Sequence, residues 1–154
     1  DDCFYVVEAP KTNGGDGAVH KIDISGVESG GTPEISSLPI TGTLFDEGME
    51  SGMAKGAYGA VFLDGDGNLY FGMNRGDHDL DSSTAASGGV YGVEMDWANG
   101  SAYAKFMSTA QNTGSNDGAV DPRSADAFAE VDTEATVLPA AKSASKRGRI
   151  APPL

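Results

Sequence analysis

The chain has 154 residues, of which 39% are apolar and 22 are glycine, and this composition predicts one domain with a modest core. Its formal net charge is −13, which disfavours nucleic acid and anionic membranes as partners because like charges repel. No window approaches the roughly 18 apolar residues that a membrane span requires.

The charge is distributed unevenly along the chain. All 23 acidic residues lie at or before Glu134, whereas Lys142, Lys146, Arg147 and Arg149 follow Pro139. We therefore divide the chain into an acidic β-domain over 1–137 and a basic tail or linker, rich in Pro, Ala and Ser, over 138–154. The chain begins without Met or a signal peptide, so we expect a mature or excised chain.

Short apolar runs bounded by turn residues predict an all-β fold. The runs lie at 4–7, 18–24, 35–43, 58–63, 69–73, 89–95 and 102–107. Pro39 suggests that the third strand is an edge strand. Turns of the Asp-Gly and Asn-Gly type join the fourth run to the fifth and the sixth to the seventh, which predicts antiparallel hairpins. Helix signals are weak, at 47–55 and 123–131, so we expect at most one short helix.

An internal repeat is the most informative pattern. Phe4-Tyr5-Val6-Val7 matches Leu69-Tyr70-Phe71-Gly72, and each is followed by a Gly-rich loop. The run at 17–23 then matches the run at 88–94, and a strand around Ile35 matches one around Phe106. The offset grows by six residues between the first two matches, because the second loop is longer. We predict two multi-strand units, at about 4–66 and 69–131.

The strings that carry this repeat are an acidic turn with Gly-Asn-Leu-Tyr at 64–70 and Gly-Val-Tyr-Gly-Val-Glu at 89–94. Over about residues 4–110 the pattern resembles the blade repeats of secreted or cell-surface β-propellers. The resemblance implies propeller-blade-like hairpin units. Two units are too few for a ring, because propellers close with at least four blades. The chain is therefore a fragment of a larger ring, is completed by other chains, or packs its two units face to face as a small sandwich.

Two acidic loops are candidates for Ca²⁺, the one cofactor that the sequence suggests. Asp64, Asp66 and Asn68 place side-chain oxygens at alternate positions of a tight turn, and hard cations prefer such oxygens. Asp77, Asp79 and Asp81 bring three like charges together in the longer loop, an arrangement that is costly unless water or a cation compensates it. For both loops the alternative is an ordinary turn.

Three further residues are candidates for contacts with partners. Asn99 begins the glycosylation sequon Asn99-Gly100-Ser101 in a predicted turn, although Asn-Gly also serves simply as a turn. Trp97 lies in the same turn, and we expect it either to contact a partner or to pack over the end of the sheet. Cys3 is the only cysteine, so it forms an intermolecular disulfide or remains a core thiol.

No arrangement typical of catalysis occurs. The chain has two histidines and no Gly-x-Ser-x-Gly elbow, phosphate-binding loop or Cys/His zinc spacing. We therefore expect a non-enzymatic extracellular structural or adhesive module that assembles with other chains or with its own copies. The alternative is a calcium-dependent lectin- or adhesin-type domain that binds a sugar or a peptide.

Overall fold

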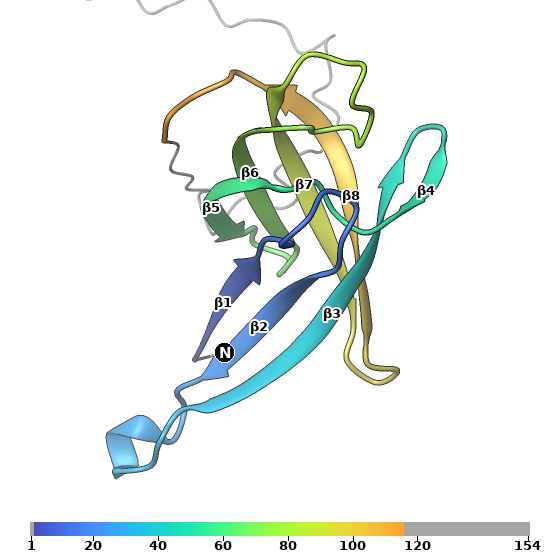
Figure 1. Cartoon of the computed structure of the whole chain (residues 1–154). Helices are drawn as coiled ribbons and strands as arrows, with labels where there is room; N and C mark the ends of the chain where they lie inside the picture. Colours follow the sequence, from blue (N-terminus) through green and yellow to red (C-terminus); the bar gives the residue numbers. More distant parts are fainter. Residues whose placement is uncertain (1, 116–154) are drawn as a thin grey trace, which may run out of the picture.

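The computed structural model describes residues 2–115, and these form a β-sheet structure (Figure 1). The strands are β1 (Cys3–Glu8), β2 (Gly17–Asp23), β3 (Glu34–Phe45), β4 (Gly48–Ser51), β5 (Gly56–Leu63), β6 (Leu69–Gly76), β7 (Ser87–Asp96) and β8 (Ser101–Ala110). The 3-10 helix η1 (Val27–Ser29) is the only helical element of the described part. The predictions of an all-β fold and of at most one short helix are confirmed for these residues.

Each of the seven predicted strands is present, at β1, β2, β3, β5, β6, β7 and β8. The weak helix signal at 47–55 was wrong, because this segment contains β4, which pairs with the end of β3 as a short hairpin. Its two glycines, Gly48 and Gly52, have φ values of +137° and +74°, which an α-helix does not contain. The second helix signal, at 123–131, and the tail at 138–154 lie outside the described residues.

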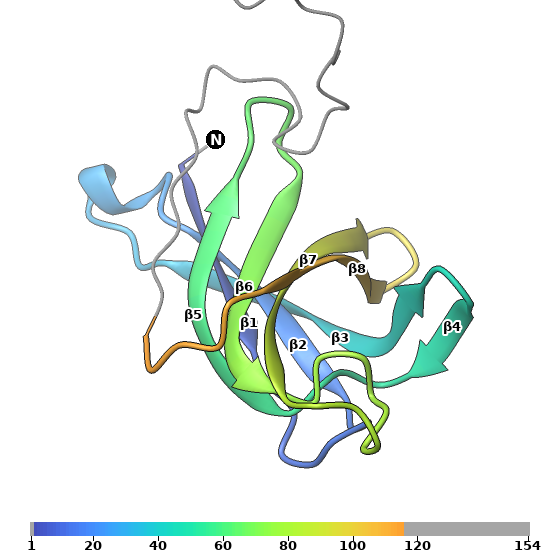
Figure 2. The ribbon, with the colours of Figure 1, turned by 90° about the horizontal axis from the view of Figure 1, so that it is seen from above.

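The strands form one sheet in the order β1-β2-β3-β8-β7-β6-β5, with β4 attached to β3. Strong curvature brings β5 back towards β1, so that the sheet is nearly a closed barrel (Figure 2). Every pairing is antiparallel except that of β3 with β8, which is parallel.

Pro39 does not mark an edge strand, because β3 lies in the interior of the sheet between β2 and β8. The described pairing of β3 with β8 begins at Ile40, immediately after the proline. Pro39 itself is therefore paired only with Ala18 of β2. A central strand tolerates the missing N–H group here because the ladder on its second side has not yet begun.

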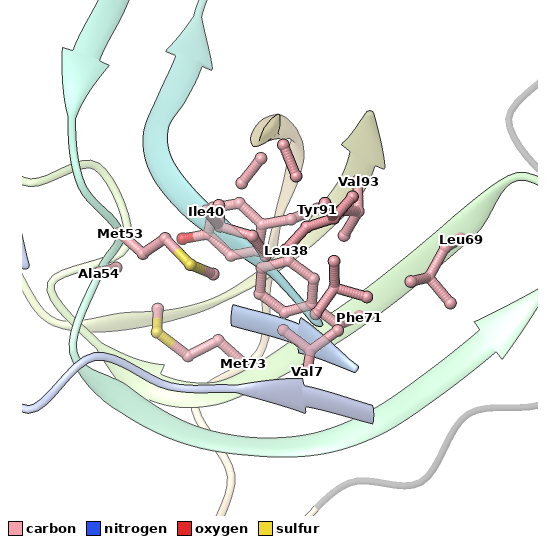
Figure 3. Packing of buried hydrophobic residues seen from close by; sticks show 13 residues of the cluster. Val7, Leu38, Ile40, Met53, Ala54, Leu69, Phe71, Met73, Tyr91 and Val93 are labelled. Atoms are coloured by element: carbon pink, nitrogen blue, oxygen red, sulfur yellow. The ribbon is translucent and has the colours of Figure 1, made fainter. Parts of the chain in front are cut away.

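Alternate residues of the curved sheet fill the barrel, as the period of two of a β-strand requires (Figure 3). The core consists of Val7, Val19, Leu38, Ile40, Met53, Ala54, Leu69, Phe71, Met73, Tyr91, Val93, Ala102 and Ala104. The rings of Phe71 and Tyr91 stack with centroids 4.9 Å apart. Met53 and Ala54, from the segment after β4, also belong to this core (Figure 3).

Two antiparallel meanders make up most of the sheet: β1–β2–β3, the first meander, and β6–β7–β8, the second meander. Residues matched in the sequence repeat occupy equivalent positions in them. In the first meander Phe4 pairs with Ile22, and Ile22 pairs with Ile35. In the second, Leu69 pairs with Val93, and Val93 pairs with Ala104. The cross-strand rows thus follow the repeat alignment in the first two strands of each meander, whereas in the third the counterpart of Ile35 is Ala104, two residues before Phe106.

The two meanders nevertheless present opposite faces to the core. In the strand order β1-β2-β3-β8-β7-β6, with β3 and β8 parallel, a half-turn about the strand direction carries one meander onto the other and turns the sheet over. Leu69 and Ala104 therefore point into the barrel and are at most 1% exposed. Their counterparts Phe4 and Ile35 point outward and are 61% and 68% exposed.

Candidate functional site

The outward surface of the first meander is the most unusual surface of the described residues. We call it the outer face; its apolar residues are Phe4 and Val6 of β1, Ala18 and Ile22 of β2, and Ile35 and Pro39 of β3. The register places Phe4, Ile22 and Ile35 in one row across three strands. Several large exposed apolar side chains grouped on one face are typical of interaction sites.

Three hydrogen-bonded polar side chains interrupt the apolar residues of the outer face. His20 lies between Glu8 and Ser37, with Nε2 3.2 Å from a Glu8 carboxylate oxygen and Nδ1 2.8 Å from the Ser37 hydroxyl. These contacts satisfy both ring nitrogens within the sheet surface. His20 thus has a structural role here, and Glu8 is the only acidic side chain among the outward-facing residues of β1, β2 and β3.

The sequence predicted strands at these positions but not an interaction surface. The available signal was the run Phe4-Tyr5-Val6-Val7, which is apolar at four consecutive positions. Such a run is typical of a strand covered on both faces. In the structure only the side that bears Val7 is covered, because Val7 is 7% exposed whereas Val6 is 45% exposed.

The loop that follows β1 and the loop that follows β6 contact each other. Asn13, from the β1–β2 loop, donates from its amide to Asp77 over 2.6 Å and accepts from the backbone N–H of Lys55 over 3.0 Å. The loop after β6 is held to the core by His78, whose carbonyl accepts the Tyr91 hydroxyl at 2.5 Å. The acidic loop is therefore an anchored part of the barrel end.

The carboxylate of Asp64 is occupied by its own turn. It accepts hydrogen bonds from the backbone of Asp66 and Asn68, from the Asn68 amide and from the Tyr70 hydroxyl, at 2.8–3.1 Å. Burial alone would raise the pKa of Asp64, but these hydrogen bonds together outweigh it and lower the pKa. Both Asp64 oxygens thus stabilise the β5–β6 hairpin.

The carboxylates of Asp77 and Asp79 lie beside each other, and all three aspartates of this loop bond to groups around them. Asp79 accepts from Thr84 at 2.9 Å, and Asp81 accepts from the backbone and hydroxyl of Ser83 at 2.9 and 2.7 Å. Burial and the neighbouring Asp79 carboxylate raise the pKa of Asp77. Over residues 2–115 no three His, Cys, Asp or Glu side chains are grouped to hold a metal ion. Ca²⁺ binding at either loop stays a prediction.

A hollow of about 570 Å³ lies between this acidic loop and the β3–β4 hairpin. Its lining includes the carboxylates of Glu47, Glu50, Asp79 and Asp81, together with Phe45 and Leu80. Leu80 adopts φ = +61°, a left-handed conformation that is rare for a branched side chain, and packs against the core. The arrangement disfavours anionic ligands here.

The turn between β7 and β8 contains two of the predicted contact residues. Asn99 is exposed, and its amide nitrogen, the atom that a glycan would modify, donates to Asp96 over 2.6 Å. Trp97 is 38% exposed beside it. Cys3 begins β1 and is a partly buried free thiol. Glycosylation, partner contact and an intermolecular disulfide at these positions stay predictions.

Comparison with known protein families, with curated proteins and with solved structures gives no match. The likeness to propeller blades therefore rests on the sequence strings alone. Within residues 2–115, no helix has the length and apolar character needed to cross a membrane. Function has to be argued from the surfaces of the chain itself.

Proposed function

We propose that the chain is a non-enzymatic structural or adhesive module of an extracellular assembly, and that it acts by binding other protein chains through the outer face. The observation that carries this proposal is the exposure of Phe4, Val6 and Ile35 at 61%, 45% and 68% on one side of three adjacent strands. These are large apolar side chains at positions whose counterparts in the second meander form the core.

The energy available from this surface is large enough for specific association. Full burial of a Phe, Val or Ile side chain contributes about 1.5–3 kcal/mol. Binding energy at protein interfaces is concentrated in a few such central residues. A partner that covers Phe4, Ile22 and Ile35 would therefore gain several kcal/mol before the cost of association is subtracted.

The charge distribution also favours the outer face as the interaction surface. The chain carries −13 overall, so most of its acidic surface repels another acidic chain. On the outer face, by contrast, Glu8 is paired with His20, and the other outward-facing residues of β1, β2 and β3 are uncharged. A mostly acidic surface that contains one face with few charges suits assembly into a larger extracellular structure.

The calcium-dependent binding domain is less well supported. Both carboxylate oxygens of Asp64 and one of Asp81 accept hydrogen bonds within their own turns. A resident Ca²⁺ ion would stabilise the fold by linkage, so addition of millimolar calcium should raise the melting temperature and a chelator should lower it. We expect neither change, and a clear calcium-dependent shift would favour this alternative.

Sedimentation equilibrium over a wide concentration range tests the assembly function. The wild-type chain should show an average mass that rises with concentration. The double variant Phe4→Ser, Ile35→Ser should remain monomeric, whereas Met49→Ser, which removes a 54% exposed apolar side chain on β4, should behave as the wild type. A wild-type chain that stays monomeric at the highest concentration would contradict the proposal.

A further inference from the structure

Two asparagines of the described residues are each followed by glycine, in the pairs Asn13-Gly14 and Asn99-Gly100. Asparagine is a chemically labile residue. It is most reactive before glycine, because glycine has no Cβ to hinder the approach of its backbone nitrogen to the preceding carboxamide. The sequence thus gives both pairs the same intrinsic reactivity, so a difference between them in the folded chain has to arise from the structure.

Asn13 and its glycine are tied to other parts of the chain. The Asn13 carboxamide donates to Asp77 over 2.6 Å and accepts from the backbone N–H of Lys55 over 3.0 Å. The backbone N–H of Gly14, whose nitrogen would have to attack, donates to the carbonyl of Met53 over 3.0 Å. These contacts have to separate before the nitrogen can reach the carboxamide, and the pair is therefore protected in the folded chain.

Asn99 is held much less firmly, at the tip of the β7–β8 hairpin. Its backbone N–H and its side-chain amide both donate to the exposed Asp96 of the same turn, over 3.0 and 2.6 Å. Within residues 2–115, no turn or loop hydrogen bond between backbone groups involves the N–H of Gly100. A Cβ added at Gly100 would meet no atom within 4 Å, so the turn is also open to solvent on this side.

We infer that Asn99 is a site of spontaneous covalent modification, at which its side chain condenses with the backbone of Gly100 and water then hydrolyses the product. The Gly100 nitrogen loses its proton to solvent base and bonds to Cγ of Asn99. The Cγ–Nδ2 bond breaks, and Nδ2 takes a proton from solvent and leaves as ammonia. Water opens the resulting cyclic imide at either carbonyl, which gives aspartate or isoaspartate. Local opening of the exposed turn is sufficient for this reaction.

The reaction changes the charge and the hydrogen bonding of the turn. Both products carry a carboxylate in place of the amide, which adds one negative charge to a chain of −13 and removes a donor to Asp96. Two neighbouring carboxylates then repel each other. The departing nitrogen of Asn99 is also the atom that a glycan would modify, so the reaction destroys the sequon. None of these residues belongs to the outer face, and the inference does not depend on the proposed function.

Peptide mapping of the full chain tests this inference, because trypsin separates the two pairs. Cleavage after Lys11, Lys21, Arg75 and Lys105 places Asn13 in the peptide 12–21 and Asn99 in the peptide 76–105, each with a single asparagine. After incubation of the native chain at mildly alkaline pH, mass spectrometry measures the replacement of amide by acid in each peptide. Conversion at Asn99 should be at least about tenfold faster than at Asn13, because fewer hydrogen bonds have to break.

Incubation in urea is the matched control, since unfolding removes every contact that distinguishes the two pairs. Both should then convert at similar rates. In the folded variant Asp77→Ala, which lacks one partner of Asn13, conversion at Asn13 should rise severalfold while that at Asn99 stays unchanged. Equal rates at Asn13 and Asn99 in the native chain would overturn the inference. So would an Asn99 that converts in urea but stays intact in the native chain, or a preference for Asn99 that persists unchanged in urea.

Discussion

The two meanders share strand order, register and an aligned sequence, yet one supplies the core with the face that the other exposes. Phe71 and Val6 occupy equivalent positions, and their exposed fractions are 0% and 45%. The difference arises from topology, since the parallel contact of β3 with β8 turns the second meander over relative to the first. As a result, the face that forms part of the core in the second meander is exposed to solvent in the first.

Substitutions at the equivalent residues Phe71 and Val6 test this difference between the meanders with the largest expected effect. Phe71→Ala should lower the free energy of unfolding by about 3–5 kcal/mol, because it removes a ring stacked on Tyr91 in the core. Val6→Ala should change it by at most about 0.5 kcal/mol in the monomer, because Val6 is exposed. Urea unfolding in dilute solution measures both. Similar losses for the two variants would contradict the assignment of faces.

Two loop glycines with positive φ, Gly52 and Gly67, provide a second comparison. Gly52 has φ = +74°, and an added Cβ would overlap the backbone carbonyl of Gly14 in the first meander's loop. Gly67, in the β5–β6 turn, has φ = +86° but open space around it. Gly52→Ala should cost about 3 kcal/mol or more, and Gly67→Ala about 1–2 kcal/mol, by thermal unfolding. Equal costs would show that the Gly14 contact is not formed.

The lowered pKa of Asp64 predicts a pH-dependent contribution to stability. A carboxyl whose pKa is lower in the folded than in the unfolded state stabilises the fold above its ordinary pKa and ceases to do so as the pH falls through the lowered value. Asp64→Asn should therefore cost about 1–2 kcal/mol at pH 7, and the deficit should shrink below about pH 4. A deficit that is constant across this range would exclude the charge as its cause.

Asp77 should show the opposite and smaller effect. Its pKa is raised, so the folded state loses stability as the pH rises from the ordinary carboxyl pKa through the raised value. Asp77→Asn should therefore stabilise the chain by roughly 0.5 kcal/mol at pH 7 and be neutral below about pH 4. The amide can still accept from Asn13, so a loss of stability would mean that the charge of Asp77 is required.

The sequence predicted the strands well, because alternating apolar residues and Gly-containing turns are local signals. It also aligned residues such as Phe4 and Leu69, which are equivalent in the two registers. It did not predict which face of each unit is buried. A period of two assigns residues to shared faces, but the parallel pairing of β3 with β8 joins strands about 60 residues apart and leaves no local pattern.

The candidate sites were predictable only as residue types. Asp64 and Asp77 both lie in acidic turns in the sequence, yet one accepts four hydrogen bonds and the other lies beside a second carboxylate. These environments depend on Tyr70 and on Asn13, from other parts of the fold. The outer face was missed because exposed apolar residues and core residues look alike in a strand.

Thiol labelling at one equivalent pair tests the opposed faces most directly. In a Cys3→Ser background, Ile35→Cys and Ala104→Cys place a thiol on the matched strands β3 and β8, at positions that are 68% and 0% exposed. In dilute native solution, Ile35→Cys should react with a maleimide at the rate of a free thiol, and Ala104→Cys should react only on unfolding. Protection of both thiols in the monomer, or equal reactivity of both, would contradict the account.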